Sequence, residues 1–174
     1  TYEAKGRPSD NPLIVHIADL EDLSEITENV PPETELLAKH FWPGPLTMIF
    51  EKSSLVPYGT TGGLDTVAVR MPSDLIARKL ILAAGGYVSA PSANTSGRPS
   101  PTTAEHVWED LNGKIEMIID GGSVDIGLES TILDMTVSPP MILRPGAITA
   151  DMLEEVIGVV SVDETILGSE SSQA

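Results

Sequence analysis

Short apolar runs alternate with helix-length amphipathic segments along the whole chain, and this alternation constrains the fold most strongly. Apolar runs bounded by turn residues are typical of buried strands, and apolar residues at helical spacing are typical of helices packed on a sheet. The runs predict strands at 13–17, 46–50, 66–71, 87–89, 117–119, 131–133 and 141–143. Strands mixed with helices in this order predict an α/β (α+β) domain built on a mixed sheet.

The helix-length segments carry recognisable start and stop signals. Asp19 is expected to cap a helix bearing Leu20, Leu23 and Ile26, and Thr102-x-x-Glu105 has the form of a capping box. The helix that begins at this capping box is predicted to run to about residue 111. Further helices are predicted at 33–41, from Ser73 or Asp74 to residue 84, and at 151–157 after Thr149. Residues 53–64 are expected to form a mobile loop, because they combine glycine, proline and hydroxyl residues.

The length of 174 residues suits one domain. We expect this domain to span residues 1–160, with residues 161–174 as a polar tail or the start of an interdomain linker. The sequence has no cysteine, no apolar run long enough to cross a membrane and no secretory leader. These features predict an intracellular, cytoplasmic protein that does not associate with membranes.

The charge balance bears on possible partners. Ten Lys and Arg residues stand against 26 Asp and Glu residues, which gives a formal net charge of −16. Such a surface repels a phosphate backbone at long range, so non-specific nucleic-acid binding is not expected. A local basic pocket remains compatible with this charge.

The arginines lie apart from the acidic segments. Arg7, Arg70, Arg98 and Arg144 each adjoin a proline or a turn, where the alternative for any one of them is a solvated surface position. Guanidinium groups on rigid loops bind carboxylate or phosphate through paired hydrogen bonds. Together the four segments predict a cleft that holds a polyanionic ligand.

A serine-rich segment at 89–103 gives a second indication of ligand binding. Seven of its fifteen residues carry hydroxyls: Ser89, Ser92, Thr95, Ser96, Ser100, Thr102 and Thr103. Small side chains, hydroxyls and amide groups ahead of a helix favour phosphate binding. A flexible linker is the alternative, although a linker rarely separates a buried strand from a capped helix.

Several familiar motifs are absent from the sequence. There is no Walker-type phosphate loop, no Gly-x-Gly-x-x-Gly after a strand and no Gly-x-Ser-x-Gly elbow. His16, His40 and His106 have no metal-ligand spacing, so no protein metal site is predicted. Ser130 precedes a strand, where it is either a turn residue or a group facing the same cleft.

Six segments together resemble the YrdC-like (TsaC-type) threonylcarbamoyl-AMP synthases. They are residues 5–16, 42–47, 67–72, 89–94, 128–131 and 142–146. The Lys-x-Arg and Ser-x-Asn signature of that family is matched by Lys5 and Arg7, and by Ser92 and Asn94. The matching segments keep their order over about residues 3–150.

This resemblance implies a twisted mixed β-sheet with flanking helices around a deep, locally positive cavity. It implies a nucleotidyltransferase that converts L-threonine, bicarbonate (or CO2) and ATP to threonylcarbamoyl-AMP and pyrophosphate. The product would supply the t6A modification, at position 37, of tRNAs that read codons beginning with A, through downstream tRNA threonylcarbamoyl transferase machinery. Mg²⁺ is expected only on the phosphates.

The resemblance also assigns roles to residues of this chain. ATP would be held by Lys5, Arg7, Asn11, Thr66, Ser92, Asn94, Ser100 and Arg144. Threonine would be held by His16, Arg70, the backbone at Ala90, and Ser130. No residue stands out as an obligatory general base, and none is assigned. Catalysis is expected to rest mainly on positioning and charge stabilisation.

The chain departs from the family pattern at its start. The family begins with a strand-and-helix segment bearing Thr-x-x-x-Tyr-Gly-Leu, whereas this sequence starts at Thr1 without that segment. We therefore expect an N-terminally incomplete domain that is inactive as it stands. Three other functions stay open: a carbamoyl-adenylate-forming relative, an RNA-binding module and a non-catalytic remnant.

Overall fold

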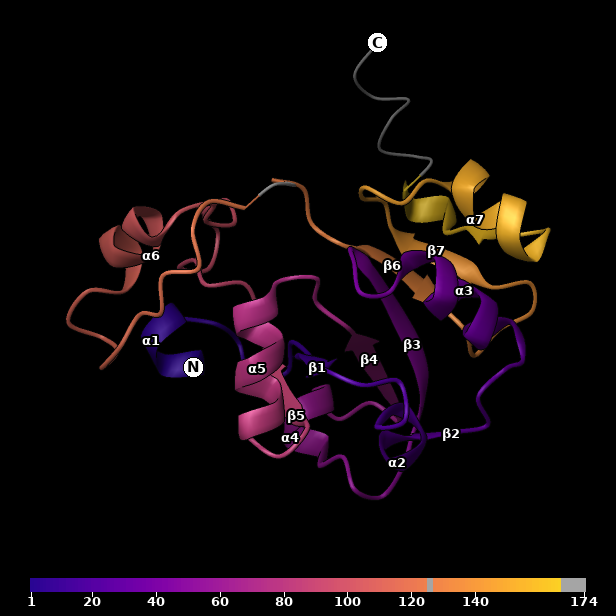
Figure 1. Ribbon diagram of the computed structural model, residues 1–174, viewed down its shortest axis with the longest axis horizontal. Helices are drawn as coiled ribbons and strands as arrows, with labels where there is room; N and C mark the ends of the chain where they lie inside the picture. The colour runs from indigo at the N-terminus through magenta and orange to yellow at the C-terminus, as the bar shows by residue number, and fades with distance from the viewer. Residues whose placement is uncertain (125–126, 167–174) are drawn as a thin grey trace, which may run out of the picture.

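The fold is a twisted mixed sheet flanked by helices, as the sequence predicts (Figure 1). The computed structural model describes residues 1–124 and 127–166. Its strands are β1 (Ile14–Ile17), β2 (Thr27–Glu28), β3 (Leu46–Lys52), β4 (Thr66–Arg70), β5 (Tyr87–Ala90), β6 (Thr131–Asp134), β7 (Met141–Arg144) and β8 (Ser161–Val162). Its helices are α1 (Tyr2–Lys5), α2 (Leu23–Ile26), α3 (Glu33–Phe41), α4 (Tyr58–Thr61), α5 (Leu75–Ala83), α6 (Ala104–Leu111) and α7 (Ala150–Ile157).

The strand order is β5-β1-β4-β3-β6-β7-β8, with β2 paired to β3 outside this path. The pairs β1–β4, β3–β6 and β7–β8 are parallel, and the pairs β1–β5, β3–β4, β2–β3 and β6–β7 are antiparallel. Consequently β3 and β4 occupy the middle of the sheet and join its two halves.

Alternation along the strands separates two faces of the sheet. Val67 and Val69 of β4 are buried in the core, whereas Thr66, Ala68 and Arg70 point to the opposite face and are only partly buried. This follows from the two-residue period of a strand. The core face packs against α2, α3 and α7, with Leu37 and Leu153 fully buried among the strand side chains. The other face is therefore left for a site.

Two of the expected helix caps are confirmed and one shifts by a residue. The side chains of Asp74 and Thr149 accept hydrogen bonds from the N–H groups of Ala77 and Met152. At α6 the cap is Thr103 rather than the expected Thr102, because Thr103 has the extended backbone of an N-cap and accepts from the N–H of His106.

Three local expectations differ from the structure. Residues 117–119 form no strand within the described ranges, and the apolar side chains of Met117 and Ile119 are exposed. The segment after Asp19 is helical only at α2, and residues 53–64 contain the short helix α4. Ile81 is the one buried residue of α5, because this helix packs beside β1 and β5, at the end of the sheet order.

Ser161 and Val162 of β8 pair with Met141 and Ile142 of β7, so the sheet includes residues just past residue 160. The domain bounds expected from the sequence stay a prediction. The polar stretch 168–174 lies outside the described residues. Among the described residues, no helix combines the length and the apolarity needed to cross a membrane.

Thr131 joins β6 to the segment that leads into α7. Its buried hydroxyl donates to the carbonyl of Ile148 at 2.6 Å and accepts from the N–H of Ile148 at 3.1 Å. We expect Thr131→Val to lower the free energy of unfolding by about 2 kcal/mol, because two buried backbone groups lose their partner. Denaturant unfolding measures this loss. The control is Thr136→Val, whose hydroxyl bonds at an exposed site and whose loss should cost clearly less; equal losses would contradict the role of Thr131.

Candidate functional site

A cavity of about 530 Å³ opens on the face of the sheet opposite the core. Its floor comes from Ile14, Ile49, Ala68 and Ile132, which belong to four strands. Its walls come from the segment after α1, the serine-rich segment after β5, residues 127–130 and the end of β7. Segments far apart in the sequence therefore meet around one space.

Most of the predicted site residues line this cavity. They are Arg7, Asn11, His16, Arg70, Ala90, Ser92, Ser100, Ser130 and Arg144. Three predicted residues, Lys5, Thr66 and Asn94, do not line it. Thr66 shares the open face of β4 with Arg70 but lies four positions earlier, which is roughly 13 Å along a strand.

Lys5 of α1 and Asn94 of the serine-rich segment itself are both buried. The ammonium group of Lys5 donates to the backbone carbonyls of Ser92 and Asn94. Burial, and then the charge of Arg7, lower the pKa of Lys5. The amide of Asn94 donates to the carbonyls of Thr95 and Arg98 at 3.0 and 2.8 Å. Both side chains thus hold the backbone of the serine-rich segment in place through hydrogen bonds to its carbonyl groups.

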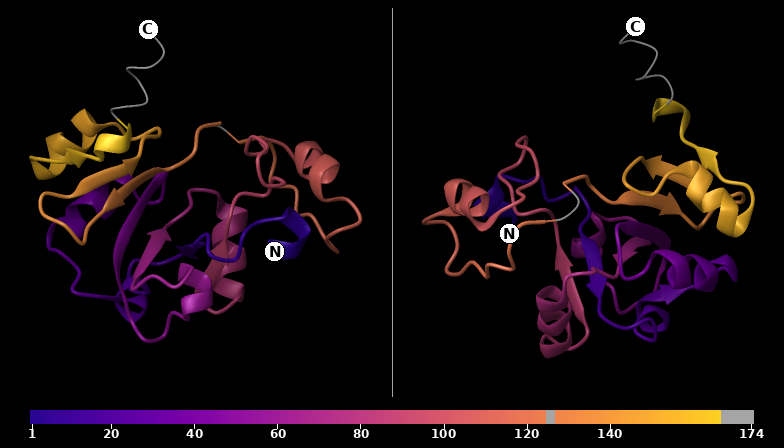
Figure 2. Two further views of the ribbon diagram at one scale, coloured as in Figure 1. Left: turned by 180° about the vertical axis from the view of Figure 1, so that it is seen from behind. Right: turned by 45° about the horizontal axis from the view of Figure 1, so that its top comes forward.

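Further bonds fix the same segment to α1 and α6, which lie side by side in both views of Figure 2. The N–H of Ser96 donates to the carbonyl of Lys5 at 3.0 Å, and the N–H of Thr95 donates to the Asp110 carboxylate at 2.8 Å. Arg98 forms an ion pair with Asp110 and, unlike the other three turn arginines, does not line the cavity. These contacts argue against a flexible linker.

Arg144 is held by the residues that precede β6. Its Nε and Nη2 donate to the carbonyl of Ser130 at 3.1 and 2.8 Å, and Nη2 also contacts the Ser130 hydroxyl at 3.0 Å. That hydroxyl bonds to the Thr47 hydroxyl of β3 at 2.7 Å. A side chain at Gly146 would lie 2.5 Å from the carbonyl oxygen of Glu129, so the close approach of these segments requires glycine there.

Arg70 and His16 occupy paired positions on the parallel strands β4 and β1. Arg70 donates through Nε to the carbonyl of Gly44 at 3.1 Å. Its pKa is lowered by burial and by the charge of Arg144. Burial, and then the charge of Arg70, lower the pKa of His16 to about 4, so its imidazole is neutral near pH 7. A neutral imidazole between strands can accept as well as donate a hydrogen bond.

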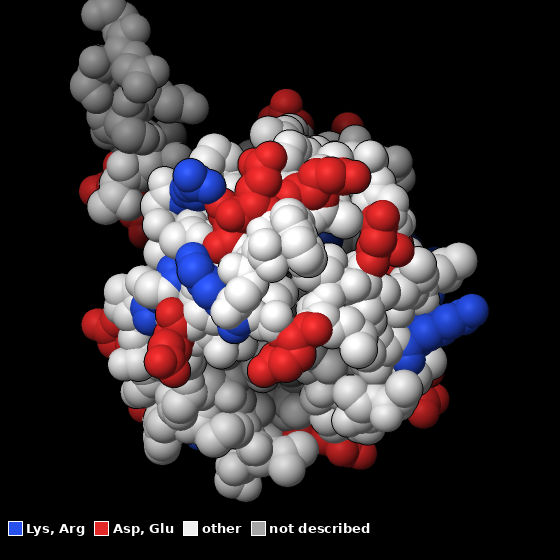
Figure 3. All heavy atoms as spheres, turned by 90° about the vertical axis from the view of Figure 1, so that its left-hand side faces the viewer, with Lys and Arg blue, Asp and Glu red and all other residues white. Residues whose placement is uncertain are grey.

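The sequence motifs assigned no role to one charged residue of the cavity, Glu129. It is the one carboxylate among the described residues that line the cavity, beside three arginines. Its position next to Ser130, in a segment that carries the resemblance, could have drawn attention to it. Elsewhere acidic side chains prevail, and on the end of the molecule in Figure 3 basic side chains lie in small groups among them. The cavity is thus locally positive in an acidic protein.

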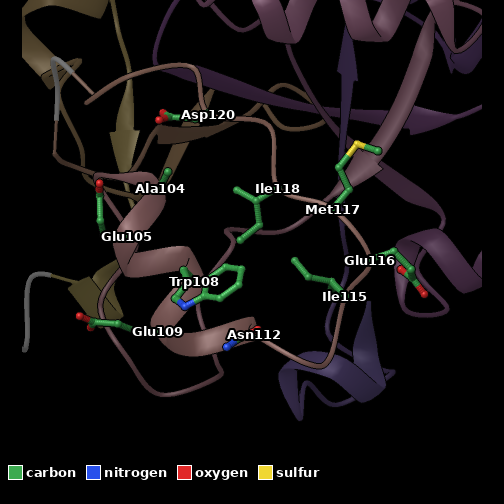
Figure 4. Close-up of a pocket in the computed structure, with 10 residues that line it drawn as sticks. All are labelled: Ala104, Glu105, Trp108, Glu109, Asn112, Ile115, Glu116, Met117, Ile118 and Asp120. Carbon is green, nitrogen blue, oxygen red and sulfur yellow. The ribbon is translucent and has the colours of Figure 1, made fainter.

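A second cavity, of about 580 Å³, lies between α6 and the segment that follows it. Trp108, Ile115 and Ile118 point into it, while Glu105 and Glu109 point away (Figure 4). None of its described lining residues is Lys or Arg. The first cavity is therefore the candidate site for an anionic ligand. Among the residues that the structure describes, no group of His, Asp and Glu is arranged to hold a metal ion.

Comparison with known proteins agrees with this architecture. Residues 1–146 match the Sua5–YciO–YrdC family model, whose description is telomere recombination. A threonylcarbamoyl-AMP synthase of Pyrococcus abyssi is 56% identical over 167 residues, which cover 96% of this chain and 49% of that protein. One of Bacillus subtilis is 52% identical over 164 residues, covering 94% of this chain and 47% of that protein.

Among solved structures, the crystal structure of P. abyssi Sua5 complexed with L-threonine matches with a TM-score of 0.92 at 56% identity. The match covers 96% of this chain and 49% of that one. The chain spans about half the length of these two curated relatives. Since the family model covers most of the chain and the fold agrees throughout, this protein belongs to the Sua5–YciO–YrdC family.

Proposed function

We propose that this chain forms the L-threonylcarbamoyladenylate synthase domain of its protein. The domain joins L-threonine, bicarbonate (or CO2) and ATP into threonylcarbamoyl-AMP and pyrophosphate. The product then serves the machinery that makes t6A in tRNA. The observation that carries the proposal is one cavity holding three arginines and several hydroxyl groups, in a family whose similar members bear this name.

On the nucleotide side, ATP would be contacted by five of the cavity residues: Arg7, Asn11, Ser92, Ser100 and Arg144. They lie on separate segments around the same cavity, and arginine forks together with hydroxyls suit phosphate oxygens. Lys5 and Asn94 would contribute by holding the serine-rich segment. The role of Thr66 stays a prediction from the sequence.

On the amino-acid side, Arg70 would pair with the carboxylate of threonine. His16 lies beside Arg70 in the register and would accept a hydrogen bond from the threonine as a neutral imidazole. Ser130 and the backbone at Ala90 border the same space. Burial, and then the charge of Arg144, lower the pKa of Arg70, and a carboxylate partner would offset the repulsion between the two arginines.

Catalysis would rest on positioning and charge neutralisation. The amine of threonine is first carboxylated to a carbamate. An oxygen of this carbamate attacks the α-phosphorus of ATP, and pyrophosphate leaves while the arginines offset the developing charge. Mg²⁺ bound to the phosphates would add to that neutralisation. A cavity lined by a single carboxylate fits a metal held chiefly through phosphate oxygens.

Arg7 tests the nucleotide side. We expect Arg7→Ala to lower kcat/KM for threonine-dependent pyrophosphate release by about 10- to 100-fold, because a charged donor to the phosphates is lost. The assay uses the full-length protein with ATP and bicarbonate, with and without threonine. Lys79→Ala, at an exposed position of α5, is the control. Pyrophosphate release that is the same in Arg7→Ala as in the parent protein would refute the role of Arg7, and release without threonine would refute the substrate.

Arg70 tests the amino-acid side. We expect Arg70→Lys to raise the KM for threonine by about tenfold while the KM for ATP changes much less, because lysine keeps the charge but not the planar fork. Initial rates at varied threonine and ATP measure the two constants separately. A parallel rise in both KM values would indicate a general disturbance of the cavity instead.

The lowered pKa of His16 predicts that the free energy of unfolding depends on pH. Its pKa is about 4 in the folded protein and near 6.5 in the unfolded chain, so the unfolded state binds more protons between these values. The contribution of His16 to stability is therefore complete above about pH 6.5 and falls as the pH drops toward 4. Denaturant unfolding across this range should show a flatter pH dependence for His16→Gln. The matching change His40→Gln, at an exposed histidine, should leave the slope unaltered.

A further inference from the structure

The carboxylate of Glu129 bridges two walls of the cavity. One oxygen, Oε2, lies 3.1 Å from Nη1 of Arg144 on β7. The other, Oε1, accepts a hydrogen bond from the Ser100 hydroxyl of the serine-rich segment at 3.4 Å. All three residues line the same cavity. A negative group of this chain therefore already contacts two of the groups proposed to bind phosphate.

The contact with Glu129 occupies Nη1, the remaining nitrogen of the Arg144 guanidinium. Nε and Nη2 both donate to Ser130, so Nη1 is the donor directed elsewhere, and it pairs with Glu129. A phosphate oxygen that approaches Arg144 along this edge meets the carboxylate first. It can bind Arg144 well only if Glu129 withdraws.

Withdrawal of Glu129 is physically inexpensive. Its side chain is 54% exposed, so the carboxylate can turn into water without a desolvation penalty. The geometry also matches the incoming group, since a carboxylate presents two oxygens to a guanidinium as a phosphate does. An isolated exposed ion pair contributes little to stability, but this one occupies groups that a ligand needs.

We infer that Glu129 is a built-in competitor for the anion site: its carboxylate holds Arg144 and Ser100 until phosphate oxygens displace it. The inference rests on the proposed function, because it takes the ligand to be a polyphosphate. Glu129 then sets how much negative charge a ligand needs in order to bind. A triphosphate or pyrophosphate displaces it more readily than a singly charged group does.

The test measures binding rather than turnover. Isothermal titration of the full-length protein with ATP, and separately with inorganic pyrophosphate, is carried out in EDTA so that no metal bridges the carboxylate to the phosphates. We expect Glu129→Gln to tighten both affinities by about three- to tenfold, because the competing charge is removed. Glu129→Asp keeps the charge on a shorter side chain. On a logarithmic scale, its affinity for each ligand should lie no higher than about halfway between the affinities of the parent protein and of Glu129→Gln.

Two controls separate this effect from others. Glu154→Gln makes the same charge change at an exposed position of α7 and should leave both affinities unchanged, which excludes a general effect of net charge. If the parent protein binds ATP and Glu129→Gln binds it equally or more weakly, the inference is overturned while the proposed function stands. If the parent protein binds neither ATP nor pyrophosphate, the nucleotide site of the proposed function fails, and the inference fails with it.

Discussion

The burial of β3 in the middle of the sheet is the constraint on which the site depends. Leu46, Met48 and Phe50 on one face of β3 are almost fully buried, and the strand pairs with β4 on one side and β6 on the other. It therefore joins the half of the sheet that carries His16 and Arg70 to the half that carries Ser130 and Arg144. The hydrogen bond between Thr47 and Ser130 makes this junction part of the cavity wall.

The three cavity arginines share one mode of support. Arg7 donates to the carbonyl of Pro12 at 2.9 Å, Arg70 to that of Gly44 at 3.1 Å and Arg144 to that of Ser130 at 2.8 Å. Each guanidinium is thus oriented by one backbone carbonyl. Orientation before a ligand arrives reduces the conformational entropy that binding costs. Burial, and then the charge of Arg144, lower the pKa of Arg70, and an anion beside these two arginines would offset their repulsion.

Much of the fold could be predicted from local patterns, and the failures have physical causes. The strands around Val15, Val67 and Leu133 are correct because buried strands need apolar runs whatever their partners are. Residues 117–119 have the same apolar character but no ladder partner within the described part of the chain. An apolar run shows that a segment can be buried, not that another strand lies beside it. Pairing is a tertiary property.

The sequence by itself determined the acidic charge, the alternation of elements, the family and most of the residues that surround the cavity, because these depend on residue type and on the order of motifs. Only the tertiary structure decided which polar groups face the cavity. Lys5 and Asn94 belong to the family signature yet bond to the backbone of the serine-rich segment and do not line the cavity, while Glu129 reaches two of its walls. The physical reason is that spacing along the chain fixes which residues are neighbours in a segment, whereas the direction of each side chain depends on strand register and on partners from distant segments.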